Sequence, residues 1–153
     1  MSYWDWAVAV HGREGVDAAL TALQDDHGQC VAYLLWAAWA SHEARGLPPE
    51  ILAQGAALAR HWEGAATRPL RAARRNLKTP APPITEEQRN ALREQVRKAE
   101  FAAERLLMET LESLAPDPDG ARRDLAADLM AAALAWSRQA PEPELRALAA
   151  LIG

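Results

Sequence analysis

The chain has 153 residues, a formal net charge of −4 and one cysteine. A chain of this length can form one domain that buries roughly 70% of the surface exposed on unfolding, and a single cysteine excludes an intramolecular disulfide. The acidic balance argues against a general nucleic-acid-binding protein, which usually has a basic domain.

The first 78 residues show helical periodicity interrupted by glycine and proline. The third predicted helix is apolar nearly all round from Val31 to Ala40, which indicates a place in the core. Gly55, on the apolar stripe of the fourth, would let a neighbour approach closely. These helices span about residues 2–10, 16–27 and 29–44, then from 49 to a break at Thr67 to Pro69, and from there to 77.

A proline-rich segment, residues 79–83, is typical of a stiff extended connector between halves 1–78 and 84–153. Thr85 and Gln88 then form a capping box that opens a helix over about 86–115, and two shorter helices follow. We therefore predict an all-α fold, a compact bundle of six to seven helices in a single domain, with the long helix at its centre.

Positive charge is concentrated in residues 49–78, which hold two acids and six bases. Arg68, Arg71, Arg75 and Lys78 recur at spacings of three, four and three, so they share one helix face. Arginine binds carboxylates and phosphates alike, so this face could take an acidic protein, a phosphorylated ligand or nucleic acid. Four aligned charges are few for nucleic acid, whose affinity rises with the number of phosphate contacts. A solvated or internally paired face is favoured.

Asp25, Asp26 and His27 end the second predicted helix just before Gly28. Acids in the last turn of a helix are disfavoured by the helix dipole and need compensation. We expect an ion pair between Asp25 or Asp26 and arginines of the basic segment, Arg71 or Arg75, and a structural role for this corner.

The same corner is the candidate for a metal or catalytic site. Adjacent residues of a helix point about 100° apart, so further ligands would be needed, and His11 is one candidate. No known motif accompanies it: Glu43 follows His42, but Gly46 stands where a zinc protease has its second histidine. Phosphate loops, nucleophile elbows and cysteine pairs are also missing from the sequence. We predict no cofactor and favour a protein that is not an enzyme.

Other sequence features bear on core and compartment. The six tryptophans are expected to converge on one core, and Cys30, in an apolar run, to be buried. Met1–Trp6 carries an acid where a secretory signal carries bases, and the charge-free segment Cys30–Ser41 is shorter than the roughly 20 residues that span a bilayer. We expect a cytoplasmic protein without a membrane segment.

Several short motifs lie in the first half of the chain. They are Trp4-Asp5-Trp6, Leu23-Gln24-Asp25, Gly28, Val31, Leu34-Leu35 and Trp39, with the basic Arg68-Pro69-Leu70-Arg71 and Arg74-Arg75. With these residues the chain resembles a small bacterial family of conserved hypothetical proteins. The resemblance implies a small helical cytoplasmic protein and carries no established activity.

The favoured function is therefore a non-catalytic protein-interaction or regulatory module, with a protein partner or self-association. One alternative is a metal-dependent or anionic-ligand-binding enzyme that uses Asp25, Asp26 and His27. The other is weak binding of nucleic acid through the face from Arg68 to Lys78.

Overall fold

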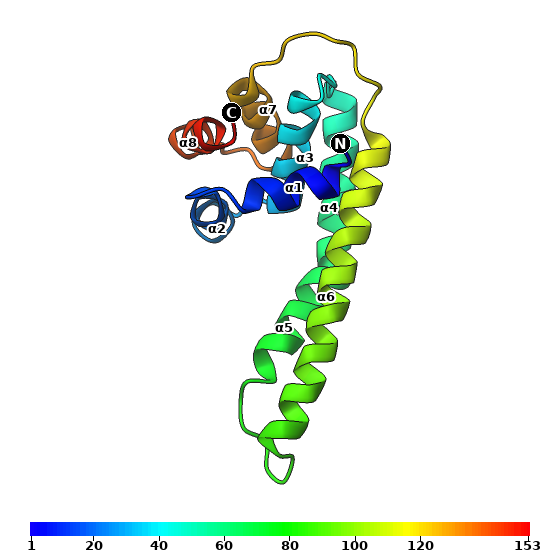
Figure 1. The fold of residues 1–153 in the computed structure, drawn as a ribbon, viewed down its shortest axis with the longest axis vertical. Coiled ribbons are helices and arrows are strands. Elements are labelled where there is room, and N and C mark those ends of the chain that lie inside the picture. Colours follow the sequence, from blue (N-terminus) through cyan, green and yellow to red (C-terminus); the bar gives the residue numbers. More distant parts are fainter. The chain divides into compact units, whose positions relative to one another are not determined.

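The computed structural model describes residues 1–153, and its regular structure is helical (Figure 1). This confirms the predicted all-α class and the long helix. There are eight α-helices, one more than the upper end of the predicted six to seven. A π-helical turn, Glu63–Thr67, separates two of them beside Pro69, where the sequence predicts a break. The α-helices are α1 (Tyr3–His11), α2 (Val16–His27), α3 (Val31–His42), α4 (Pro49–Trp62), α5 (Arg68–Asn76), α6 (Glu86–Leu114), α7 (Leu125–Trp136) and α8 (Glu142–Ile152).

Contacts along the chain define two compact units. The acidic unit comprises residues Met1–Ala59 and Met108–Gly153, and the basic unit comprises Arg60–Leu107. The basic unit holds eleven bases and six acids, for +5, whereas the acidic unit holds six bases and fifteen acids, for −9. The proline-rich residues 79–83 lie within the basic unit. A single domain over residues 1–153 stays a prediction.

Helix α3 forms the centre of the acidic unit, where it packs against α1, α2 and α7. Every residue from Tyr33 to Ser41 is buried, as the uniformly apolar sequence predicted. Gly55 of α4 accommodates the ring of Trp36, because a Cβ at that position would lie 2.5 Å from the ring atom Cζ3. The close approach expected at Gly55 is therefore confirmed.

The tryptophans do not all share this core. Trp6, Trp36 and Trp39 are buried in the acidic unit, whereas Trp62 is partly exposed and belongs to the basic unit. The indole of Trp62 donates a hydrogen bond to the Ala103 carbonyl at 2.8 Å. The expectation of one common tryptophan core is therefore wrong, because indole rings serve two separately packed units.

Within the basic unit, α5 and the first part of α6 lie side by side (Figure 1). The capping box is formed as predicted: the Gln88 amide donates to Thr85 Oγ1 at 3.2 Å, and the Thr85 amide donates to Gln88 Oε1 at 3.0 Å. Arg89 Nη1 also donates to the Leu77 carbonyl at 3.0 Å. These contacts fix the reversal of the chain between the two helices. No helix has both the length and the apolar character needed to cross a membrane.

Candidate interaction surface

Two glutamates of α6 bind two arginines of α5. Arg71 Nε lies 3.1 Å from Glu100 Oε1, and its Nη2 lies 3.3 Å from Glu104 Oε1. Arg74 Nε lies 2.6 Å from the other Glu100 oxygen, Oε2. Both oxygens of Glu100 therefore accept from guanidinium groups. We call these four residues the Arg–Glu cluster.

Because Glu100 is buried, its carboxylate needs cationic partners in order to stay ionised. The residue is only 7% exposed, and burial by itself would raise the pKa of the carboxyl. Hydrogen bonds from Arg74 and Arg71 outweigh burial, so the pKa of Glu100 lies below its usual value. The hydrogen bond with Glu100 likewise raises the pKa of Arg74. The cluster is a charged internal contact that holds α5 on α6.

The face predicted from Arg68 to Lys78 is consequently divided between two roles. Arg71 is 25% exposed and contacts α6, whereas the side chains of Arg75 and Lys78 are exposed. Arg68 is 73% exposed and approaches Glu63 at 3.8 Å, a contact that stabilises little in water. We call Arg68, Arg75 and Lys78 the cationic edge.

Large apolar side chains are also exposed on the basic unit. Leu92 and Leu106 are 49% and 54% exposed, and the seven-residue spacing of Leu92, Ala99 and Leu106 places all three along one exposed face of α6. Ile84 and Phe101 are 54% and 51% exposed. The basic unit therefore exposes both cationic and apolar side chains.

The corner formed by Asp25, Asp26 and His27 lies in the acidic unit, where it meets α8. His27 Nε2 lies 3.5 Å from Glu144 Oε1. A surface depression is lined here by Asp26, His27, Ser137–Pro141, Pro143 and Glu144. His11 instead faces Asp17 at 3.8 Å. No group of three or more histidine, cysteine, aspartate or glutamate residues is placed to hold a metal ion.

The corner also has a clear structural role. Gly28 ends α2 with a φ of +63°, a conformation that glycine adopts without strain. Its carbonyl accepts a hydrogen bond from the Trp136 indole at 2.8 Å, and Gln29 Nε2 donates to Ser137 Oγ at 3.2 Å. The turn after α2 is thereby joined to the end of α7.

The carboxylates that bind Arg71 are Glu100 and Glu104, and not the expected Asp25 or Asp26. A pairing of Asp25 or Asp26 with Arg75 stays a prediction. Sequence reasoning also missed Arg74. The spacing does contain a signal, because arginines three residues apart on one helix can pair with glutamates four residues apart on a neighbouring helix. That signal can be used only when α5 and α6 are known to pack together.

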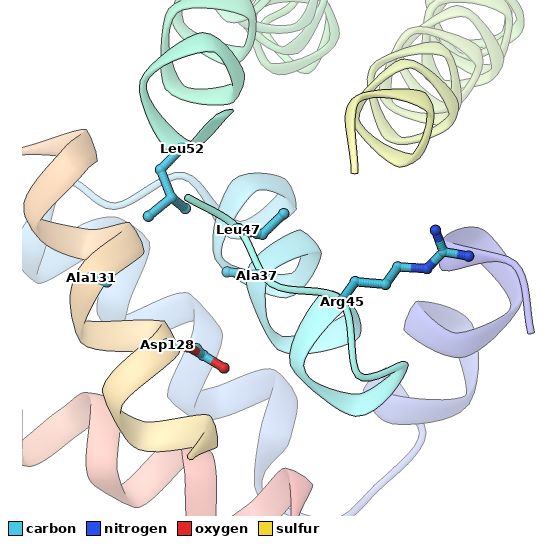
Figure 2. A pocket seen from close by; sticks show the side chains of 6 residues that line it. All are labelled: Ala37, Arg45, Leu47, Leu52, Asp128 and Ala131. Carbon is cyan, nitrogen blue, oxygen red and sulfur yellow. The ribbon is translucent and has the colours of Figure 1, made fainter. Parts of the chain in front are cut away.

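A small cavity in the acidic unit offers no further site. It has a volume of about 20 Å³, the size of one water molecule, and is lined by Ala37, Arg45, Leu47, Leu52, Asp128 and Ala131. Figure 2 shows the Arg45 guanidinium extending away from Asp128. Its Nη1 donates to the Pro116 carbonyl at 2.7 Å, so this arginine serves packing.

Comparison with known families places the chain. A family model described as a protein of unknown function (DUF2390) matches residues 2–111, well over half of the sequence. The chain belongs to this family. The DUF2390 match contains the whole basic unit, with the Arg–Glu cluster, and ends before α7 and α8. The resemblance seen in the first half of the sequence is confirmed. No curated protein and no solved structure matches the chain.

Proposed function

We propose that this DUF2390 protein is a non-catalytic interaction module that binds an acidic protein through the cationic edge of its basic unit. The observation that carries the proposal is the division of charge on α5. Arg71 and Arg74 are neutralised by Glu100 and Glu104, whereas Arg75 and Lys78 point into solvent. The basic unit carries +5 although the chain as a whole carries −4, so an acidic partner is attracted locally, within about a Debye length of this unit.

A protein partner fits this surface better than a nucleic acid does. Three cations form the cationic edge, and affinity for a phosphate backbone grows with the number of ion contacts. Leu92 and Leu106, which are exposed on the same unit, cannot bind phosphates, but they would add apolar area to an interface with a protein. We also propose that the protein works in the bacterial cytoplasm, where the buried thiol of Cys30 would stay reduced.

Affinity capture tests the proposal. The bait is the full chain, used with extract of the native cell at physiological salt, in parallel with and without nuclease treatment. Its variant Arg75→Glu/Lys78→Glu reverses both charges at the cationic edge. The matched control Arg122→Glu/Arg146→Glu makes the same change in net charge at exposed arginines of the acidic unit.

We expect acidic proteins to be captured by the wild type and the control and to be at least tenfold depleted with the cationic-edge variant. A purified captured protein should then bind the wild type directly, with an affinity that falls as salt rises. Equal capture by all three baits would contradict the proposal. Capture that disappears on nuclease treatment would favour the nucleic-acid alternative instead.

A further inference from the structure

We propose that one partner of the cationic edge is the acidic unit of a second copy of this chain, so that the protein self-associates through contacts between opposite charges. This inference rests on the proposed function and names a partner for the same surface. The complementarity is large, since one unit carries +5 and the other −9.

The cationic side of this contact is the end of α5. Arg75 lies in the last turn of the helix and Lys78 follows just after it, with both side chains exposed. The guanidinium groups of Arg71 and Arg74 are already paired with carboxylates inside the Arg–Glu cluster. Two long cationic side chains at one tip of the basic unit can therefore reach into a depression on another molecule.

The acidic side is the depression beside the end of α2. Asp26 and Glu144 both line it, and Asp25 is an exposed neighbour of Asp26. Carboxylates around a concave surface are suited to guanidinium and ammonium groups, which donate charge-assisted hydrogen bonds. His27 and Arg138 also line the depression, so the cations would sit at its acidic side rather than fill it.

Every copy carries both surfaces, so the cationic edge of one molecule can bind the acidic depression of another. Because these ion pairs are exposed, salt should dissociate them: the Debye length is about 14 Å at 0.05 M and about 4 Å at 0.5 M.

Sedimentation velocity of the full chain provides the test. At low salt, we expect the average sedimentation coefficient to rise with protein concentration, and at high salt we expect a monomer at every concentration. The cation variant Arg75→Glu/Lys78→Glu and the acid variant Asp25→Lys/Asp26→Lys should each associate at least tenfold more weakly than the wild type. Lysines at the end of α2 suit the helix dipole, so the acid variant should fold, which circular dichroism verifies.

Mixing the two variants distinguishes a specific contact from damage. Their altered surfaces are complementary to each other, so the equimolar mixture should associate although neither variant does so alone. A wild type that is monomeric at low salt, or a mixture that stays monomeric, would overturn the inference. A monomeric wild type would leave the capture of other acidic proteins standing, so the two proposals fail separately.

Discussion

Arg74 donates from Nε to Glu100 Oε2 at 2.6 Å, the shortest of the contacts that Glu100 makes with the arginines of α5. This pair decides which cations of the basic segment remain for a partner. Glu100 and Glu104 together balance the charges of Arg71 and Arg74, and the cationic edge consists of the cations outside this cluster. Stability of the basic unit and its capacity to bind should therefore depend on different residues.

Removing the charge of Glu100 should destabilise the basic unit. Glu100→Gln leaves two guanidinium groups facing a neutral amide, and we expect a loss of about 2 kcal/mol, typical of hydrogen bonds to charged groups. Amide hydrogen exchange in α5 measures the local effect. The control Glu94→Gln breaks the exposed pair with Arg97 and should leave exchange nearly unchanged. Equal effects of the two substitutions would contradict a special role for Glu100.

The effect of Glu100 should depend on pH. Its pKa is lower in the folded protein than in the unfolded chain, so its contribution is complete above the unfolded value of about 4.3 and is lost as pH falls through the folded value. Hydrogen-exchange protection of α5 should therefore differ between wild type and Glu100→Gln at pH 7, and the difference should shrink as pH falls below the unfolded value. A difference that stays constant over this range would show that the carboxylate charge contributes nothing.

Gly55→Ala should destabilise the acidic unit, although alanine is the better helix former. The added methyl would lie 2.5 Å from the buried ring of Trp36, and the cost of overpacking should exceed the helix preference by about 1 kcal/mol. Urea unfolding followed by tryptophan fluorescence measures the change. Gly64→Ala is the matched control, because no atom lies within 4 Å of its added Cβ. If Gly55→Ala were as stable as Gly64→Ala, the close packing on Trp36 would be wrong.

Divalent metal ions should not raise the melting temperature. The corner joins His27 to Glu144, but His11 lies with Asp17 instead, and no third ligand completes a site. Thermal scans with Zn²⁺, Mn²⁺ or Mg²⁺ should therefore coincide with scans in chelator, since a ligand that binds the folded state alone raises its stability. A rise that Asp26→Ala abolishes would revive the metal-dependent alternative.

Local sequence signals were sufficient for most of the helices. The capping box at Thr85, the proline at 69 and the glycine at 28 act on their own segments, and each produced the expected start, break or end. The partner of Arg71 depends instead on which helices meet across the turn at residues 79–83. Periodicity identifies a charged face, but not the element that it contacts, so Glu100 and Arg74 were not identified beforehand.

Chemical labelling of arginine and lysine measures which cations belong to the Arg–Glu cluster and which to the cationic edge. The labels are read by mass spectrometry, on the free protein and on the protein bound to a captured partner. We expect Arg75 and Lys78 to react at the rates of exposed side chains and to be protected in the complex, while Arg71 and Arg74 react slowly in both states. Equal labelling of Arg71, Arg74 and Arg75 in the free protein, or no protection of Arg75 and Lys78 in the complex, would contradict the proposed binding surface.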